Sequence, residues 1–294
     1  MKLVSFKVGG QVRHGVLLGA EGAEQVRDLG SGDLLALVEG GAEALQAARN
    51  AAGPERALAD VQLVAPIRRP PKLLALAANY QDHITESGAP RVDKDRIVPK
   101  LFLKPSSAII GPGETLCLPT VSQTTDWELE LAVVIGSRCR NVTTERALDH
   151  VFGYTIANDV SARTVEWGVE RDENTWNEFF DWLNGKWPDG FAPLGPYVLT
   201  ADEVPNPQAL EMRLTVNGEQ KQHASTREMI FGVAEAIAFA SRFMTLEPGD
   251  IIETGTPSGV GAATGTYVKE GDVMEGWIEK LGTLRTPVGP PTSS

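Results

Sequence analysis

An alternating run of acidic and apolar residues is the segment of this sequence with the clearest chemical meaning. It reads Asp126-Trp127-Glu128-Leu129-Glu130-Leu131-Ala132-Val133-Val134. Because the side chains of a strand point alternately to its two faces, the three carboxylates are expected on one face. Like charges on one face repel each other, and a nearby cation would reverse that repulsion. The run therefore indicates a site for Mg²⁺ or Mn²⁺, which prefer oxygen ligands, or an edge strand with a solvated acidic face.

A further metal ligand is expected from Asp159, at the point where an apolar strand gives way to polar residues. Asn158-Asp159 is equally typical of a turn or a helix cap. Arg163 could hold a substrate carboxylate or pair with Asp159. Lys186, in a Gly-Lys-Trp-Pro-Asp-Gly segment, could be a functional cation or an ordinary loop lysine.

His83 is followed three residues later by Glu86, and this spacing can build a general base. On a helix such residues share one face, so the carboxylate can orient the imidazole and raise its basicity. A lone His-x-x-Glu pair is by itself more typical of a protein surface. The polar stretch 87–95 that follows could form a mobile lid.

A loop rich in glycine and hydroxyl residues, 254–261, reads Thr-Gly-Thr-Pro-Ser-Gly-Val-Gly. Its backbone N–H groups and hydroxyls could bind an anion, or its glycines could build a tight turn with positive φ. No Gly-Lys-Ser/Thr follows and no GxGxxG is completed, so nucleotide-binding loops of these types are excluded.

Short strands are expected to position these residues. Apolar or alternating runs predict strands near 73–77, 101–103, 127–135, 151–156, 212–216 and 251–254, and apolar spacing predicts a helix over 229–244. Residues 4–18 predict a hairpin, and Pro66, Pro70 and Pro71 follow a short strand near 61–64. The sequence therefore predicts an α+β, β-rich chain with a small N-terminal α+β domain (1–66), a catalytic domain (67–286) and a flexible Pro-, Ser- and Thr-rich tail (287–294).

Composition narrows the class of partner. The chain has 294 residues, 27 Lys and Arg against 39 Asp and Glu, and a formal net charge of −12. Such a charge repels phosphate backbones and anionic lipids, so no nucleic acid or membrane partner is expected. The two cysteines are too few for a disulfide framework. With neither a signal peptide nor a long apolar run in the sequence, a cytoplasmic protein is expected.

Taken together and in this order, six segments resemble the fumarylacetoacetate hydrolase family over roughly residues 70 to 285. The segments are Asn79-Tyr80-x-x-His83-x-x-Glu86, the run 102–112, the run 126–132, Asn158-Asp159-Val160-Ser161-Ala162-Arg163, Pro193-Leu194-Gly195-Pro196 and the run 246–261.

The resemblance implies a mixed β-sandwich roll and a homodimer. It implies that Glu128, Glu130 and Asp159 bind one Mg²⁺ or Mn²⁺ per chain, and that His83 and Glu86 activate water with Lys186 as a further catalytic group. By the same resemblance, the residues that contact the substrate are Arg163, Thr256, Tyr80 and Lys104.

One departure from the compact members concerns the longer stretch 164–185, in which aromatic residues cluster. The cluster comprises Trp167, Trp176, Phe179, Phe180 and Trp182. It could cap the pocket, form the dimer interface or pack as a local core.

The reaction expected from the resemblance is hydrolysis of a carbon–carbon bond in a 2,4-dioxo acid, such as an acylpyruvate or a fumarylacetoacetate-like compound of aromatic catabolism. Two alternatives use the same enolate chemistry. They are isomerisation of 5-carboxymethyl-2-hydroxymuconate or 2-hydroxyhepta-2,4-diene-1,7-dioate and decarboxylation of oxaloacetate-like acids. The presence of both His83 and Glu86 favours hydrolysis, because decarboxylation needs no activated water. A non-catalytic binder of metal-chelating 2-oxo acids is a further alternative.

Overall fold

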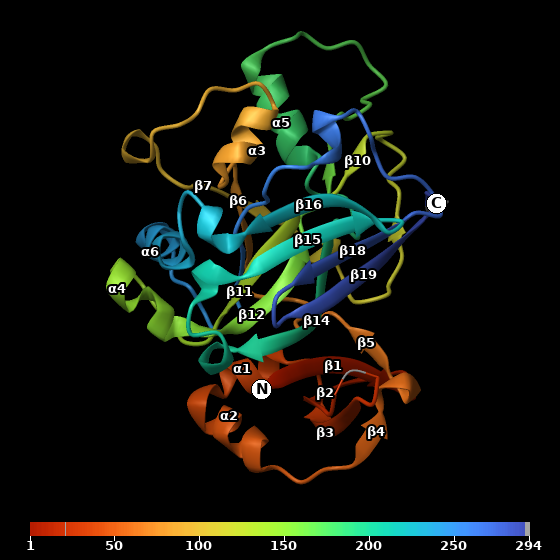
Figure 1. Cartoon of the computed structure of the whole chain (residues 1–294), viewed down its shortest axis with the longest axis vertical. Helices are drawn as coiled ribbons and strands as arrows, with labels where there is room; N and C mark the ends of the chain where they lie inside the picture. The colour runs from red at the N-terminus through yellow and green to blue at the C-terminus, as the bar shows by residue number, and fades with distance from the viewer. Residues whose placement is uncertain (21, 292–294) are drawn as a thin grey trace.

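The computed structural model describes residues 1–20 and 22–291 and consists mainly of two β-sheets (Figure 1). The strands along the main sheet are, in spatial order, β4 (Glu55–Ala57), β3 (Gln25–Ser31), β2 (Gln11–Leu18), β1 (Lys2–Val8), β14 (Ala192–Thr200), β12 (Val151–Asn158), β11 (Leu129–Ile135), β17 (Ile251–Glu253), β6 (Leu73–Ala77) and β7 (Lys100–Lys104). Two short strands join this sheet, β5 (Gln62–Val64) on β1 and β8 (Ile109–Ile110) on β14.

The second sheet packs against one face of the first. Its order is β16 (Glu219–Ser225), β15 (Glu211–Val216), β18 (Val273–Ile278), β19 (Gly282–Gly289) and β9 (Leu116–Cys117), and β10 (Thr125–Asp126) pairs separately with β13 (Ser161–Ala162). The predicted apolar face of β11 provides Leu129 and Leu131, which share one buried cluster with Leu214 and Met274 of the second sheet. This arrangement confirms the α+β, β-rich sandwich.

The helices are short and lie around the sheets (Figure 1). They are α1 (Leu35–Glu39), α2 (Gly41–Asn50), α3 (Gln81–Glu86), α4 (Thr144–Ala147), α5 (Thr175–Asn184) and α6 (Val233–Phe243). Single 3₁₀ turns occupy Leu58–Asp60, Lys94–Arg96, Ser106–Ala108, Leu148–His150, Ala201–Glu203, Pro207–Ala209, Thr226–Glu228 and Gly261–Ala263. The helix expected over 229–244 begins later, at Val233, because the Glu235 carboxylate accepts the N–H of Gly232 and caps the helix there.

Residues 1–66 continue the main sheet. The predicted hairpin is confirmed as β1 and β2, and β1 also pairs with β14 through Lys2↔Leu199 and Leu3↔Val198. On the sheet face opposite the second sheet, Val38 of α1 packs in one cluster with Val134 and Ile251. The N-terminal segment lies at one end of the molecule in Figure 1, far from α3 and α5.

The prediction that a flexible tail begins at residue 287 is wrong. Strand β19 runs to Gly289, and the Val288 N–H donates to the Asp272 carbonyl at 2.8 Å. The buried Val288 side chain, 4% exposed, gives this stretch an apolar anchor that its Pro- and Ser-rich composition concealed. Residues 292–294 of the predicted tail lie outside the described part of the chain.

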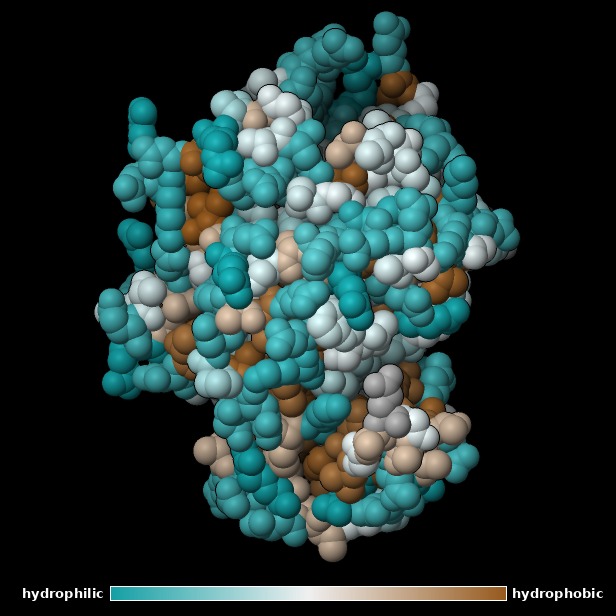
Figure 2. Space-filling model, in the orientation of Figure 1, coloured by the Kyte–Doolittle hydropathy of each residue, from teal (hydrophilic) through white to brown (hydrophobic). Residues whose placement is uncertain are grey.

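Hydrophilic side chains cover most of the face drawn in Figure 2, and apolar side chains gather over the N-terminal strands. Among residues 1–20 and 22–291, no helix combines the length and apolar character needed to cross a bilayer.

Candidate active site

Adjacent ends of β11 and β12 position the predicted carboxylates. These antiparallel strands pair Leu129 with Asn158 and Glu130 with Ala157. The pairing continues beyond the ladder, because the Asp159 N–H donates to the Glu128 carbonyl at 2.9 Å. Residues paired across an antiparallel ladder point to the same face. This register brings Glu128, Glu130 and Asp159 together, with one oxygen of each within 4.8 Å of the others, and all three are buried.

Two buried lysines, Lys186 and Lys104, balance part of the negative charge of this cluster. The Lys186 ammonium lies 2.9 Å from Glu128 Oε2 and 2.6 Å from Asp159 Oδ2. Burial would raise the pKa of Glu128, but Lys186 and Arg163 outweigh it and lower that pKa to about 2. Asp159 and Glu128 in turn hold the pKa of Lys186 above its ordinary value against the effect of burial, so this ammonium stays charged.

Glu130 is the carboxylate of the three whose charge is least compensated. Burial, with the neighbouring charges of Asp159 and Glu253, raises its pKa well above the ordinary value. One oxygen accepts the N–H of Gly255 at 2.5 Å, and no ion pair is found for it among the described residues. Three buried carboxylates, one of them without an ion pair among the described residues, supply oxygen donors that fit a hard divalent cation.

Asp126, which shares the predicted acidic face, does not join this cluster. Its carboxylate accepts the N–H groups of Gly261 and Ala262 at 2.7 and 2.8 Å and the Nε–H of Arg163 at 2.8 Å. Asp126 therefore anchors the loop after β17 and holds Arg163 in place.

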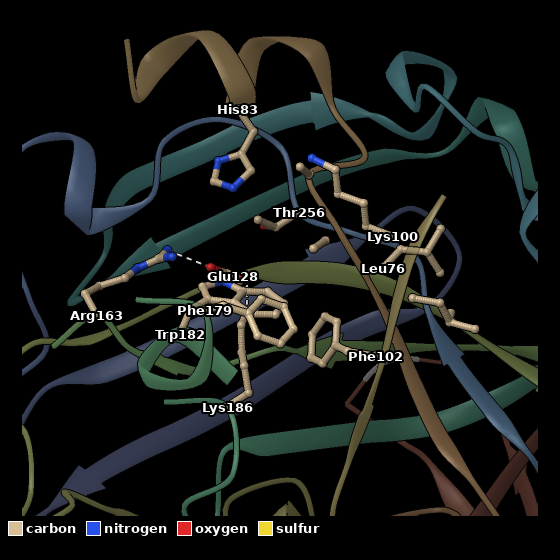
Figure 3. Close-up of a pocket in the computed structure, with 13 residues that line it drawn as sticks. Leu76, His83, Lys100, Phe102, Glu128, Arg163, Phe179, Trp182, Lys186 and Thr256 are labelled. Carbon is tan, nitrogen blue, oxygen red and sulfur yellow. Dashed lines mark hydrogen bonds and ion pairs between the residues drawn. The ribbon is translucent and has the colours of Figure 1, made fainter. Parts of the chain in front are cut away.

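The pair of His83 and Glu86 forms as the helical spacing predicts, on α3. His83 Nδ1 lies 2.6 Å from Glu86 Oε1, while Glu86 Oε2 accepts the N–H of Gly259 at 2.7 Å. Because Nδ1 is engaged by the carboxylate, Nε2 is the ring nitrogen left for chemistry. The ring lines the same pocket as Glu128 and Lys186 (Figure 3).

A cavity of about 420 Å³ lies between the carboxylates and α3. The ring centroids of Phe102 and Trp182 are 5.0 Å apart, and Phe179 adds to this aromatic wall (Figure 3). The aromatic cluster of 164–185 is thus divided. Trp182 and Phe179 line the pocket, whereas the Trp176 side chain is 71% exposed.

Arg163 and Thr256 reach the pocket with their polar groups already engaged. Arg163 pairs with Asp126 and Glu128, at 2.8 and 2.6 Å, and not with Asp159 as the sequence allowed. The Thr256 hydroxyl donates to the Leu129 carbonyl at 3.0 Å and accepts from the Gln222 amide at 2.8 Å.

The structure does not bring Tyr80 and Lys104 into the pocket lining, where substrate-contacting residues were expected. The buried Tyr80 hydroxyl donates to Met212 Sδ at 3.5 Å, because its ring packs in the main core. Lys104 is buried as well, and its ammonium contacts the Asp159 carboxylate and donates to the Phe191 carbonyl at 2.8 Å. In this structure Lys104 therefore contacts a carboxylate of the cluster and does not line the pocket.

A family model described as fumarylacetoacetate (FAA) hydrolase C-terminal matches residues 72–289. The chain belongs to the fumarylacetoacetate hydrolase family. This finding confirms the resemblance carried by the ordered motifs, and members of the family are enzymes.

Relatives of the chain within the family carry out different reactions. It is 38% identical to the mitochondrial oxaloacetate tautomerase of Xenopus laevis, over 98% of this chain and 90% of that protein. It is 41% identical to the 2,4-didehydro-3-deoxy-L-rhamnonate hydrolase of Sphingomonas sp. (strain SKA58), over 98% of this chain and 96% of that protein. The structure of the maleylpyruvate hydrolase of Sphingobium sp. SYK-6, solved in complex with manganese(II) and pyruvate, matches this chain with a TM-score of 0.78 and 32% identity. The match covers 99% of this chain and 100% of that chain.

Sequence reasoning missed three residues of this family member's site. Gln222 binds the Leu129 N–H as well as Thr256, but a glutamine in a polar strand carries no distinctive signal. Lys100 lines the pocket and resembles any surface lysine in the sequence. Glu253 is fully buried, with neither oxygen hydrogen-bonded among the described residues. The sequence carried a signal for Glu253, because a single acidic residue directly follows two isoleucines in an apolar run.

Proposed function

We propose that this protein is a divalent-metal-dependent hydrolase that cleaves a carbon–carbon bond in a 2,4-dioxo acid. The observation that carries the proposal is the 2.6 Å contact between His83 Nδ1 and Glu86 Oε1, with His83 lining the same pocket as Glu128 of the carboxylate cluster. A base fixed in one tautomer, opposite a cation site, is the combination that water activation requires.

The cation would be held by Glu128, Glu130 and Asp159, which supply oxygen donors only. When bound, Mg²⁺ or Mn²⁺ would supply Lewis-acid polarisation of the oxygens of the 2-oxo acid. The guanidinium of Arg163, fixed by Asp126, is placed to meet the substrate carboxylate.

The chain's own groups move the proton and balance the charge. His83 Nε2 takes a proton from water, and Glu86 stabilises the imidazolium that results. The hydroxide attacks the C4 carbonyl, and the C3–C4 bond then breaks with its electron pair going to C3. The Lys186 ammonium faces the negative charge that develops on oxygen. The His83 imidazolium then returns its proton to C3, which completes the products, pyruvate and a carboxylic acid.

Proton transfer without bond cleavage is the second candidate. A relative that is 38% identical over 98% of this chain is an oxaloacetate tautomerase. The same base, His83, could move a proton between carbon and oxygen of a 2-oxo acid without any attack by water. This reaction needs the same pocket, so substrate trials must include oxaloacetate.

The ultraviolet absorbance of acetylpyruvate, followed with Mg²⁺, with Mn²⁺ and with chelator, tests the proposal. Metal-dependent loss of the signal with release of pyruvate and acetate is expected. Oxaloacetate is run in parallel. Tautomerisation or decarboxylation of oxaloacetate, with acetylpyruvate untouched, would replace the hydrolase assignment by the corresponding reaction. Binding of both acids without any product would indicate a non-catalytic binder.

A further inference from the structure

Strand β7 connects the carboxylate cluster to the mouth of the pocket. Its alternate residues Lys104, Phe102 and Lys100 point to the same face, because side chains of a strand alternate. Lys104 contacts Asp159, Phe102 forms the aromatic wall with Trp182, and Lys100 lines the outer pocket. At about 3.3 Å per residue, the Cα atoms of Lys104 and Lys100 are about 13 Å apart. One strand thus carries a cation at the cluster, an apolar wall and a second cation farther out.

Lys100 differs from the other cations of the pocket in its pairing. Arg163 is bound by Asp126 and Glu128, and Lys186 by Glu128 and Asp159. For Lys100, no hydrogen bond or ion pair of its ammonium is found among the described residues, and the side chain is exposed. Figure 3 shows it extending from its strand towards the side of the pocket where His83 lies.

Lys100 also marks the place where the pocket meets a second, larger cavity. That cavity, of about 810 Å³, shares Ala78, His83, Lys100, Arg163 and Trp182 with the pocket. It continues along the loop after α3, past Ser87 and Pro90. A ligand seated at the carboxylate cluster therefore has room to extend past Lys100.

We propose that Lys100 selects substrates whose acyl group ends in a carboxylate. This inference rests on the proposed function, because it takes the 2-oxo acid end of the substrate to lie at the carboxylate cluster. The middle of the acyl chain then packs against Phe102 and Trp182, and its terminal carboxylate reaches the ammonium of Lys100. The preferred substrate is a dicarboxylate with a short apolar or unsaturated spacer. A charged acceptor suits an unpaired ammonium better than a neutral tail does.

Binding of two 2-oxo acids that cannot be hydrolysed tests Lys100 independently of turnover. 2-Oxoadipate has a distal carboxylate, and 2-oxohexanoate is its neutral counterpart of equal chain length. We expect the wild-type protein with Mn²⁺ to bind 2-oxoadipate about tenfold more tightly, which corresponds to about 1.4 kcal/mol. Titration calorimetry at low salt measures both affinities. Equal affinities in the wild-type protein would overturn the proposal.

Three variants locate the preference. Lys100→Gln should lose it, Lys100→Arg should keep most of it, and Lys269→Gln, an exposed lysine outside both cavities, should leave it unchanged. A preference that persists in Lys100→Gln would also overturn the role of Lys100. Weaker binding of both acids to the same degree in Lys100→Gln would indicate a structural defect and contradict selection of the tail.

Turnover then separates this inference from the proposed function. Succinylpyruvate and its terminal primary amide differ only in the distal charge. The wild-type enzyme should show the lower KM for succinylpyruvate, and Lys100→Gln should raise that KM about tenfold and abolish the difference between the two substrates. If no acylpyruvate is cleaved but the binding preference remains, the hydrolase assignment fails and the role of Lys100 stands.

Discussion

Glu86 accepts the backbone N–H of Gly259 at 2.7 Å through the carboxylate oxygen that His83 does not use. The helix that carries the base is thereby tied to the loop that follows β17, although these segments are far apart in the sequence. Because the same loop donates N–H groups to Asp126, which holds Arg163, base and guanidinium are fixed relative to one another.

Removal of the base should slow the reaction without weakening the binding of the metal ion. His83→Ala is expected to lower kcat by about 10²- to 10⁴-fold, the usual contribution of a general base. Its Mn²⁺ affinity should stay close to that of the wild type, since His83 is not part of the carboxylate cluster. Steady-state kinetics and metal titration measure the two effects. Loss of metal binding in this variant would contradict the role of His83.

Gly259 is expected to tolerate no side chain. Its φ is +99°, and an added Cβ would lie 2.1 Å from the Lys221 carbonyl oxygen. Gly259→Ala should therefore lower the free energy of unfolding by about 2–4 kcal/mol, from backbone strain and overpacking together. Gly265→Ala is the matched control, because Gly265 also has positive φ, +66°, but open space around it. Denaturant unfolding of both variants measures the difference, and equal losses would show that the close approach is unimportant.

Asp159 should be essential for folding stability as well as for metal binding. Asp159→Asn removes the charge that two buried ammonium groups, Lys104 and Lys186, contact. Loss of one partner of a buried ion pair destabilises by about 3–5 kcal/mol. Asp149→Asn, which removes an exposed partner of Arg146, should change stability by less than about 1 kcal/mol. Thermal unfolding in chelator compares them, and an unchanged Tm for Asp159→Asn would refute the expectation.

Glu253 makes the stability of the metal-free protein depend on pH. Burial raises its pKa from 4.5 to about 8, although Lys104 acts in the opposite direction. Between these values the folded protein binds more protons than the unfolded chain, so the free energy of unfolding falls as pH rises from 4.5 to 8. The pKa of Glu130 is raised as well, so Glu253→Gln should flatten this slope in part.

Denaturant unfolding in chelator at several pH values measures the slope. Glu270→Gln, at an exposed position, serves as the control and should retain the wild-type slope. A slope in Glu253→Gln that equals that of the wild type would show that the buried carboxyl does not titrate in this range.

Local periodicity predicted the parts of this structure that depend on neighbouring residues. The alternation of 126–134 predicted a strand with one apolar face, and Trp127 and Leu131 pack in the core as that pattern requires. The spacing of His83 and Glu86 likewise predicted their contact. These features need only the geometry of one element.

Long-range pairing determined the features that periodicity could not predict. Asp126 fits the acidic face of the strand, yet its carboxylate accepts hydrogen bonds from the backbone N–H groups of residues 261 and 262 and does not join the cluster. Lys104 lies in a matching motif and on the same face of β7 as Phe102, but it is buried and its ammonium contacts Asp159. The tail beyond residue 286 joins β19 because Val288 finds a place in the core. Each outcome depends on partners distant in the sequence.

The pairing of β1 with β14 means that the catalytic part of the chain is not an autonomous module. Cutting after Pro66 would leave the β14 backbone at Val198 and Leu199 as an open edge, and it would strip the cover of α1 from Val134 and Ile251. Open edges and bare apolar faces promote self-association. A chain that begins at residue 67 is therefore expected to aggregate on size-exclusion chromatography, because residues 1–66 cover a strand edge and an apolar face of the rest of the chain.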